Sequence, residues 1–279
     1  MTKACVIGWP ISHSRSPLIH GYWLKHYGLD GSYTRQPVEP SELATFIGDL
    51  EKSGYAGCNV TIPHKEAVFA LVTPADDTTM RLGAVNTVYL RDGRLLGTNT
   101  DGEGFINSLS QGAPQLRIAD RKAVVLGAGG ASLAVVNAIL EQGAAEVAIA
   151  NRTREKAEQL RIRFGPRVVP VDWDKLSDQL GESSLLVNTT SLGMKGQPEL
   201  SIDLSRLPQD AVVTDIVYTP LRTRLLHDAA NRGNTVVEGL GMLLHQAVRG
   251  FSLWFGVTPQ VTEVLHDLVA RDIEPGFSR

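Results

Sequence analysis

Cysteine is nearly absent from this sequence of 279 residues, which contains only Cys5 and Cys58. Both lie in apolar, strand-like runs, so a disulfide framework is ruled out and an intracellular location is the simplest inference. The sequence also lacks any apolar run near the roughly 20 residues that a membrane helix needs. Its first ten residues lead into a predicted strand without the long apolar segment of a signal peptide. We therefore expect a cytoplasmic protein with no membrane partner.

An excess of basic charge is also lacking. The chain has 27 Lys and Arg against 30 Asp and Glu, and its net charge of -3 predicts no nucleic-acid partner. The seven histidines form no HExxH motif, the cysteines no zinc-type pair, and no GxSxG elbow occurs, so no metal site and no acyl chemistry are predicted. The sequence does not decide whether the protein forms a homodimer.

The remaining composition, 43% hydrophobic and 20% charged residues, is typical of a folded domain. Strand-like and helix-like segments alternate, which predicts an α/β fold of two domains, the first with a mainly parallel sheet. A polar stretch, SLSQGAPQLRIADRK, separates the two series, and the domain boundary is expected between about Gly102 and Arg121. The strand-like segments span residues 4–8, 32–38, 57–62, 122–126, 146–150, 184–187, 211–217 and 234–240. Asp92-Gly93 is a turn signal within a predicted hairpin, and two amphipathic helices are expected at 241–256 and 259–271.

A glycine-rich turn, KAVVLGAGGAS, joins a predicted strand to an alanine-rich helix in the second series. Gly127 and Gly129 match the first two glycines of a dinucleotide-binding fingerprint, and Ser132 stands at the third position. Such a turn lets a pyrophosphate approach the backbone at a helix N-terminus, which predicts a Rossmann domain. The alternative is a glycine turn that only allows the helix to pack on the strand.

The residues after the next predicted strand indicate which dinucleotide binds. An NAD-selective fold would usually place a carboxylate there, whereas this chain has Asn151, Arg152, Thr153, Arg154, Glu155 and Lys156. Arginines can grip a 2′-phosphate that a carboxylate would repel. NADP(H) is therefore the predicted cofactor. A solvated charge run at a helix start is the alternative.

Three later strand ends also fall where doubly wound sheets bind ligands. They are the NTTSLGM stretch, Ile216-Val217 and Gly239. Backbone groups at these places could hold a nicotinamide, and the sequence does not say which atoms would do so.

A serine pair near the N-terminus suggests a binding site for a small carboxylate. Ser14 and Ser16 bracket Arg15, and Ser16-Pro17 is a helix-start signature, with a capping hydroxyl and proline at the first helical position. Two hydroxyls would thus meet the positive end of a helix. Helix capping alone would explain Ser16 and would leave Ser14 without a role.

Polar residues also gather at or near the ends of other strand-like segments: Asn59, Thr61, Asn86, Asn99 and Asp101. Amides, hydroxyls and a carboxylate at sheet ends suit a polyhydroxylated ligand. Asn and Asp are also common turn formers, which is the alternative for each of them.

Lys65 lies in the stretch NVTIPHK, where a strand-like run is followed by a helix-like pattern with Pro63 at its expected first position. In the first helical turn the backbone dipole favours an acidic residue and disfavours a cation. A lysine there needs an explanation other than helix stability.

Together these stretches resemble the shikimate dehydrogenase family, with matches from Gly8 to about Gly256. The motifs that carry the resemblance are, in chain order, SHSRSPLIH, NVTIPHK, GAVNT, NTDGEGF, GAGGA, NRT, NTTSLGM, DIVYTPLRT and GLGMLLHQA. Gly21 and Leu133 stand where the family often has asparagine and arginine, and neither touches the chemistry that the resemblance implies.

The resemblance implies an NADP-dependent oxidoreductase that interconverts 3-dehydroshikimate and shikimate in chorismate and aromatic amino-acid biosynthesis. It implies a substrate domain at 1–103, completed by 240–279, an NADP-binding Rossmann domain at 104–239, and an active site in the cleft between them. Lys65 and Asp101 would be catalytic, and the substrate would contact Ser14, Ser16, Thr61, Lys65, Asn86, Asp101, Tyr218 and Gln246. The cofactor would contact Asp77, Gly127, Ala128, Gly129, Gly130, Ala131, Asn151, Arg152, Thr153, Arg154, Glu155, Lys156, Ile216 and Gly239.

The implied reaction gives Lys65 a role, because reducing a ketone requires a positioned proton donor for the oxygen. The field of the helix N-terminus disfavours the charged form of Lys65, whereas Asp101 opposes this effect and orients the amine. Three alternatives remain open. Lys65 could be a surface residue tied to Asp101, the enzyme could be a quinate/shikimate dehydrogenase that uses NAD, or the protein could be a catalytically idle NADP-binding regulator.

Overall fold

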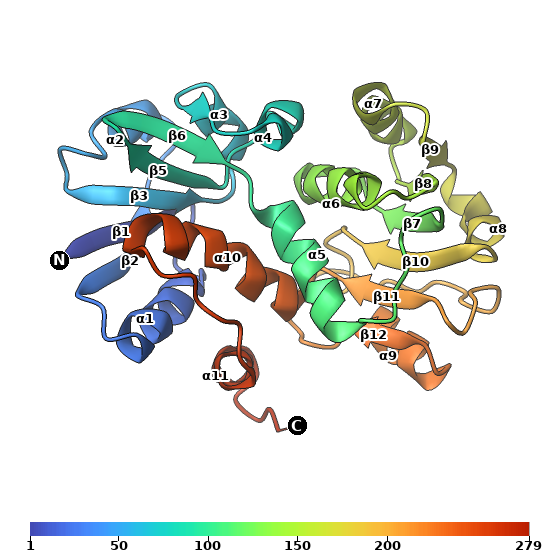
Figure 1. Ribbon diagram of the computed structural model, residues 1–279. Coiled ribbons are helices and arrows are strands. Elements are labelled where there is room, and N and C mark those ends of the chain that lie inside the picture. Colours follow the sequence, from blue (N-terminus) through green and yellow to red (C-terminus); the bar gives the residue numbers. More distant parts are fainter. Residues whose placement is uncertain (279) are drawn as a thin grey trace. The chain divides into compact units, whose positions relative to one another are not determined.

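The computed structural model describes residues 1–278, which form two units (Figure 1). Met1–Thr100 and Gln246–Val269 make the first unit, and Asp101–His245 makes the second together with the residues from Ala270 onward. The divisions thus fall at 100/101 and 245/246, beside the expected 103/104 and 239/240. The last residues group with the second unit, where the Glu274 carboxylate accepts a hydrogen bond from the Leu221 N–H at 2.8 Å.

The sheet of the first unit has the strand order β2-β1-β3-β5-β6-β4. Its strands are β1 (Thr2–Gly8), β2 (Gly31–Pro37), β3 (Tyr55–Val60), β4 (Thr73–Pro74), β5 (Thr87–Arg91) and β6 (Arg94–Thr98). The β1/β2, β1/β3 and β4/β6 pairs are parallel, and the β3/β5 and β5/β6 pairs are antiparallel. The predicted α/β architecture is confirmed, with a sheet that is mixed and parallel in most of its pairs.

Helices cover both faces of this sheet, because its strands are apolar on both sides (Figure 1). The helices are α1 (Ser16–His26), α2 (Leu43–Gly48), α3 (Lys65–Phe69), α4 (Asp77–Leu82), α10 (Gly239–Phe255) and α11 (Glu263–Ile273). Cys5, Cys58 and Val60 pack with α2 and α3 on one face. On the other face α10 contributes Trp254, whose indole N–H donates to the Val88 carbonyl at 3.0 Å.

The predicted hairpin at Asp92-Gly93 is confirmed, and it joins β5 to β6 directly. Both turn residues have positive φ, 51° for Asp92 and 70° for Gly93, as the common two-residue hairpin turn requires. The turn sets the register of the two strands, in which Thr87 lies opposite Thr98.

The sheet of the second unit is entirely parallel, with the order β12-β11-β10-β7-β8-β9. Its strands are β7 (Lys122–Leu126), β8 (Glu146–Ala150), β9 (Val168–Val171), β10 (Ser183–Asn188), β11 (Val212–Asp215) and β12 (Thr235–Val237). This is the strand order of a Rossmann fold, so the Rossmann prediction is confirmed. The order reverses between β7 and β10, and ligands of such sheets bind at the carboxyl ends of the strands there.

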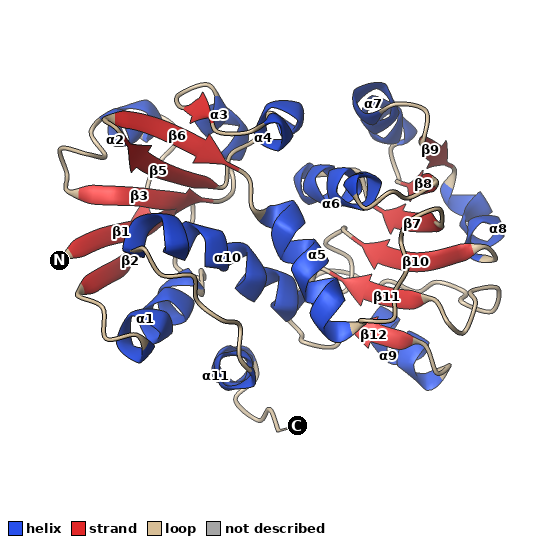
Figure 2. Cartoon of the chain, viewed as in Figure 1, coloured by secondary structure: helices blue, strands red, loops and turns tan. Residues whose placement is uncertain are grey.

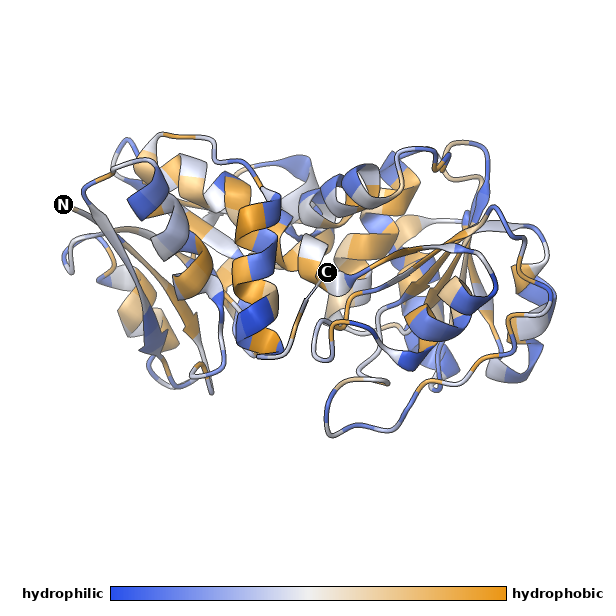
Figure 3. Cartoon of the chain, turned by 90° about the horizontal axis from the view of Figure 1, so that it is seen from below, coloured by the Kyte–Doolittle hydropathy of each residue, from blue (hydrophilic) through white to orange (hydrophobic). Residues whose placement is uncertain are grey.

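Helices also cover both faces of the second sheet (Figure 2). The helical segments are α5 (Asp101–Gly112), α6 (Gly130–Glu141), α7 (Arg154–Phe164), η1 (Trp173–Lys175), α8 (Leu176–Leu180) and α9 (Arg224–Asn231). One core packs α5, α6 and α7 on the sheet, and another packs α8 and α9 on its opposite face. In Figure 3 the strands of this unit are largely orange, and the surrounding loops are largely blue, as expected for a sheet buried on both faces. None of the helices within residues 1–278 is long and apolar enough to cross a membrane.

Candidate functional site

Ser14 and Ser16 lie together at the start of α1, although not in the predicted capping arrangement. The N-cap of α1 is Arg15, so Ser16 does not cap the helix. Instead the Ser14 hydroxyl accepts a hydrogen bond from the Ser16 N–H at 3.4 Å and donates to the Ser16 hydroxyl at 3.3 Å. The capping prediction for Ser16 was wrong because the helix starts one residue earlier than the Pro17 rule suggested. Ser14 therefore supplies the hydroxyl that meets the helix start, and the two hydroxyls lie side by side.

Lys65 is the first residue of α3, so its predicted place in the first helical turn is confirmed. The prediction that Pro63 opens the helix was wrong, because Pro63 lies in a turn and the N-cap is His64. The buried His64 ring contacts the Val38 carbonyl at 2.8 Å, which holds the turn against the sheet. The Lys65 carbonyl accepts a hydrogen bond from the Val85 N–H at 2.9 Å, so the backbone of Lys65 lies beside the GAVNT stretch.

Asn86 is the centre of a buried hydrogen-bond network in the first unit, and it directly precedes β5. Its side-chain oxygen accepts from the Thr100 N–H and from the Thr87 hydroxyl, both at 2.9 Å. Its side-chain nitrogen donates to the Thr100 hydroxyl at 3.0 Å. The Thr100 hydroxyl in turn lies 2.7 Å from the backbone carbonyl of Gln246 in α10. Two predicted substrate contacts, Asn86 and Gln246, are thus joined through Thr100, and Asp101 follows Thr100 directly in the chain.

Asn59 and Asn99, which the sequence grouped with Asn86, are buried within the first unit. The Asn59 oxygen accepts from the Tyr33 hydroxyl at 2.6 Å, and its nitrogen donates to the Asn86 carbonyl at 3.2 Å. The Asn99 nitrogen donates to the Ala84 carbonyl at 3.0 Å. Thr61, by contrast, is partly exposed after β3.

His20 is fully buried under the serine pair and stacks on Tyr33, with ring centroids 3.9 Å apart. Burial lowers its pKa to about 3, so the ring is neutral at physiological pH. His20 is a packing residue of the aromatic core, and it offers no proton to a reaction at neutral pH.

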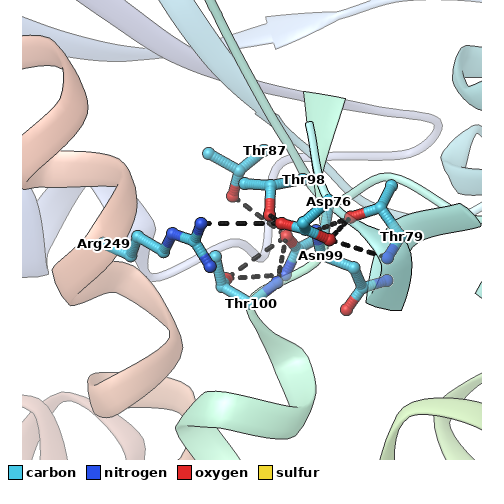
Figure 4. Close-up of polar contacts among 8 residues, drawn as sticks. Asp76, Thr79, Thr87, Thr98, Asn99, Thr100 and Arg249 are labelled. Atoms are coloured by element: carbon cyan, nitrogen blue, oxygen red, sulfur yellow. Dashed lines mark hydrogen bonds and ion pairs between the residues drawn. The ribbon is translucent and has the colours of Figure 1, made fainter. Parts of the chain in front are cut away.

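Asp76, which the sequence analysis missed, organises the segment next to this network (Figure 4). Its carboxylate caps α4 by accepting from the Thr79 N–H at 2.8 Å, and it also accepts from the Thr98 hydroxyl at 2.8 Å. Arg249 reaches it from α10 at 3.5 Å. Burial alone would raise the pKa of Asp76, but the hydrogen bonds from Thr79 and Thr98 and the charge of Arg249 outweigh it, so the pKa is lowered. The adjacent Asp77 is exposed at the first position of α4.

The predicted glycine-rich turn connects β7 to α6 in the second unit. Gly127 has a φ of 102°, and a Cβ there would lie 2.8 Å from the Thr189 hydroxyl, so glycine is needed for both reasons. A Cβ at Gly129 or Gly130 would meet no atom within 4 Å among the described residues, so packing of the protein does not explain these two glycines. Ser132 is fully buried at the position of the third glycine, and its hydroxyl donates to the Gly129 carbonyl. The turn is open on the side where a ligand would meet the N-terminus of α6.

The NRTREK stretch begins where β8 ends. The Asn151 oxygen accepts from the Ala128 N–H at 3.1 Å, which ties this stretch to the glycine-rich turn. Arg154 is paired with Asp172 at 2.5 Å and with Glu158 at 3.3 Å. Arg152 is exposed and has no ion pair within residues 1–278. Of the two arginines predicted to bind the cofactor, Arg154 is therefore already held by two carboxylates, and Arg152 is not.

Ile216 and Gly239 lie against each other at the carboxyl ends of β11 and β12. A Cβ on Gly239 would lie 2.6 Å from the Ile216 carbonyl, so only glycine fits. The buried Asp215 accepts from the Val217 N–H at 2.9 Å and from the Asn188 amide at 3.0 Å, which holds the loops after β10 and β11. Burial raises the pKa of Asp215 despite these hydrogen bonds. Tyr218 follows in the same loop and is partly exposed.

The residues that sequence reasoning missed share one feature: each is a polar residue at or just beyond a strand end whose hydrogen bonds stay within its own unit. They are Asp76, Thr87, Thr100 and Asp215. A local signal exists for Asp215, which closes the strand-like run AVVTD. Thr87 and Thr100 each follow an asparagine, and Asp76 follows Pro74-Ala75, so no apolar run marks them. No three His, Cys, Asp or Glu residues in the described part of the chain are placed to hold a metal ion.

The first unit offers hydroxyls, amides and one lysine at the strand ends, a set suited to a polyhydroxylated small molecule. The second unit offers an open glycine turn at a helix N-terminus, with a free guanidinium nearby, a set suited to a phosphorylated dinucleotide.

Three sequence families match the chain. A family described as the shikimate dehydrogenase substrate binding domain matches residues 6–88, one described as shikimate / quinate 5-dehydrogenase matches 109–195, and one described as the shikimate 5′-dehydrogenase C-terminal domain matches 239–266.

Among curated relatives, the NADP(+) shikimate dehydrogenase of Azorhizobium caulinodans is 54% identical over 273 residues, which cover 98% of this chain and 97% of that protein. The NADP(+) shikimate dehydrogenase of Rhodopseudomonas palustris strain TIE-1 is 55% identical over 274 residues, with 98% and 97% covered.

Among solved structures, a Thermus thermophilus shikimate 5-dehydrogenase in complex with NADP(H) and shikimate matches with a TM-score of 0.85 and 36% identity, covering 98% of this chain and 100% of that one. A Corynebacterium glutamicum quinate dehydrogenase in complex with NAD matches with a TM-score of 0.87 and 30% identity, covering 96% and 98%.

The contacts of Asp76 with Thr79, Thr98 and Arg249 predict a contribution to the free energy of unfolding that depends on pH. Because folding lowers the pKa of Asp76, its stabilisation is present above the unfolded-state value of about 3.9 and is lost as pH falls through the lower folded-state pKa. Asp76→Asn should reduce the free energy of unfolding by about 1–3 kcal/mol at pH 7, because an amide nitrogen cannot accept from Thr98 or pair with Arg249. Urea unfolding from pH 7 to pH 3 should show this difference shrinking toward acid pH.

The matched control is Asp77→Asn, which removes the exposed neighbouring carboxylate and leaves the network intact. An Asp76→Asn effect that stays constant across the pH range, or that Asp77→Asn reproduces, would contradict the assignment.

Proposed function

We infer that the chain catalyses the reversible reduction of 3-dehydroshikimate to shikimate with NADPH, because it belongs to the shikimate dehydrogenase family. The observation that carries this conclusion is the identity of more than half of the residues with NADP(+) shikimate dehydrogenases over nearly the whole length. The protein is an NADP-dependent oxidoreductase with two α/β units, one of which is a Rossmann fold. The reaction belongs to chorismate and aromatic amino-acid biosynthesis.

We further propose that the first unit binds the substrate. The neighbouring hydroxyls of Ser14 and Ser16 at the start of α1 support a carboxylate subsite. The amide of Asn86 supports hydroxyl recognition, with Thr61 and Gln246 as further contacts in this unit that the family motifs imply. The motifs also imply contacts from Asp101 and Tyr218, which belong to the second unit. The match of residues 6–88 to a substrate binding domain supports the same division of labour.

Lys65 is proposed as the acid–base group and Asp101 as its partner. The Lys65 ammonium is a donor that could protonate the ketone oxygen as it becomes an alkoxide, or stabilise that oxygen by its charge. The backbone bond from Val85 to the Lys65 carbonyl fixes the start of α3, so the lysine stem begins from a rigid point. In the oxidation direction the neutral amine would accept the hydroxyl proton.

The second unit is proposed to hold NADP(H), which supplies the hydride when bound. The glycine turn fits this role, because Gly129 and Gly130 leave open space that packing of the protein does not require. Arg152 would bind the 2′-phosphate, and Asn151 shapes the site through its bond to the Ala128 N–H. The other proposed contacts in this unit are Gly127, Ala131, Thr153, Arg154, Glu155, Lys156, Ile216 and Gly239. Asp77 of the first unit is the remaining proposed contact.

We also propose that the protein is cytoplasmic and that it binds no nucleic acid. The free thiols of Cys5 and Cys58 support a reducing compartment, and the net charge of -3 gives no general attraction to nucleic acid.

The activity is tested by following reduced nicotinamide at 340 nm with shikimate or quinate, each with NADP or NAD. Turnover should be largely confined to shikimate with NADP, because Arg152 favours a 2′-phosphate and no carboxylate follows β8 to hold a ribose hydroxyl. Comparable turnover of quinate or NAD would place the enzyme among the quinate/shikimate dehydrogenases. Binding of NADPH without turnover of either substrate would instead indicate a regulator.

Lys65→Met should lower kcat by at least about 100-fold, because a positioned general acid typically contributes that much or more. Binding of NADPH, measured by its fluorescence, should be retained, since Lys65 is proposed to act on the substrate alone. Lys52→Met is the matched control, because Lys52 is an exposed lysine that forms a surface ion pair with Asp49. Near-normal turnover of Lys65→Met would show that the acid–base role is wrong.

Arg152→Ala should raise the KM for NADPH by roughly 10- to 100-fold, the value expected for losing hydrogen bonds to a charged group. Arg154→Ala should have a smaller effect, because Arg154 is already paired with Asp172 and Glu158. The internal control is NADH, which lacks the 2′-phosphate, and its KM should not change in Arg152→Ala. Equal losses with NADH and NADPH would argue against phosphate recognition by Arg152.

A further inference from the structure

We propose that Thr87 is a positioning residue, which fixes the side-chain amide of Asn86 so that Asn86 meets the substrate as a hydrogen-bond donor. This inference rests on the proposed function, because it deepens the role of Asn86 in substrate binding. Thr87 is fully buried at the start of β5 and does not reach the surface of the unit.

The orientation of the Asn86 amide follows from one backbone group. The N–H of Thr100 can only donate, and it points at one end of the amide at 2.9 Å. That end must therefore be the oxygen, and the other end the nitrogen. The nitrogen then donates to the Thr100 hydroxyl at 3.0 Å.

The direction of the Thr87 hydroxyl follows from a second backbone group. The Asn86 carbonyl can only accept, and it lies 3.2 Å from one end of the Asn59 amide, which must therefore be the nitrogen. The Tyr33 hydroxyl donates to the other end at 2.6 Å, in agreement with this assignment. The same Asn59 nitrogen donates to the Thr87 hydroxyl oxygen at 3.1 Å. The single hydrogen of Thr87 is therefore left to point at the Asn86 side-chain oxygen, 2.9 Å away.

These two fixed directions saturate the oxygen of the Asn86 amide. It accepts from the Thr100 N–H and from the Thr87 hydroxyl, so both of its lone pairs are used. An amide flip would set the nitrogen against the Thr100 N–H in a buried place and would remove the acceptor of the Thr87 hydroxyl, which is unfavourable. Asn86 can therefore offer a ligand its nitrogen and not its oxygen, and the partner on the substrate must be an acceptor such as a hydroxyl oxygen.

The sheet contains a matched residue that separates positioning from general stability. Thr98 lies directly opposite Thr87 in the β5/β6 pair and is equally buried. Its hydroxyl also makes a side-chain hydrogen bond, but to Asp76 at 2.8 Å rather than to Asn86 (Figure 4). Removing the Thr87 hydroxyl costs its bonds to Asn59 and Asn86, and removing the Thr98 hydroxyl costs its bond to Asp76. Of the two hydroxyls, the one on Thr87 acts on Asn86.

The test compares Thr87→Val, Thr87→Ser and Thr98→Val by steady-state kinetics and thermal unfolding. Thr87→Val should raise the KM for shikimate by ~10-fold, as expected when a buried hydrogen bond no longer holds its partner, with the KM for NADP changed by less than about 2-fold. Thr87→Ser keeps the hydroxyl and should restore the wild-type KM for shikimate. Thr98→Val should lower the melting temperature and leave the KM for shikimate unchanged. If Thr87→Val does not fold, Thr87→Ala makes the same comparison without a branched side chain.

A double-mutant cycle shows whether Thr87 acts through Asn86. In an Asn86→Ala background, Thr87→Val should cause no further rise in the KM for shikimate. The inference is overturned if Thr87→Val has the wild-type KM for shikimate, if Thr98→Val raises it equally, or if the effects of Thr87→Val and Asn86→Ala simply add. The proposed function fails separately, when the wild-type protein does not turn over shikimate with NADP.

Discussion

The side-chain oxygen of Asn86, accepting from a backbone N–H and a buried hydroxyl, is the interaction on which the first unit's site depends. Buried polar groups must find partners inside the protein. Here the side-chain oxygen of Asn86 accepts from Thr87 and Thr100, and its backbone carbonyl accepts from Asn59. Thr100 ends the segment that leads into α5, Thr87 begins β5, and Asn59 lies in β3. One amide therefore aligns the ends of neighbouring strands. The proposed substrate contacts on these strand ends are therefore held in place by the hydrogen bonds of Asn86.

The second unit follows the same principle with a carboxylate in place of an amide. Asp215 accepts from the Val217 N–H, the Asn188 amide and, at 2.7 Å, the Thr223 hydroxyl, so the loops after β10 and β11 share one buried acceptor. Close backbone contact adds to this order at Gly239, which lies against Ile216. In both units, polar groups at strand ends are first used to hold loops in place. The chemistry then rests on loops that have little freedom to move.

Periodicity and turn chemistry predicted most of the fold, because both are local properties of the chain. The hairpin at Asp92-Gly93 and the strand–turn–helix at Gly127 needed only residues close in sequence. The short strand β9 escaped prediction, since it has four residues and contains Pro170. The pairing of Arg154 with Asp172 and the network from Tyr33 to Asn86 also escaped it. Their partners are distant in sequence, and no local pattern reports which hydroxyl meets which amide.

The two-residue turn at Asp92-Gly93 also limits how this region can vary in length. Because the turn fixes Thr87 opposite Thr98, the hydroxyls of the two residues reach different partners. Deleting one residue within β6 would slip the ladder by one position and turn each of its side chains to the opposite face. Extra residues at the tip of the turn would leave the ladder as it is. Insertions or affinity tags placed at the tip of this turn should therefore leave the proposed substrate site intact. Length changes inside β5 or β6 should disrupt it.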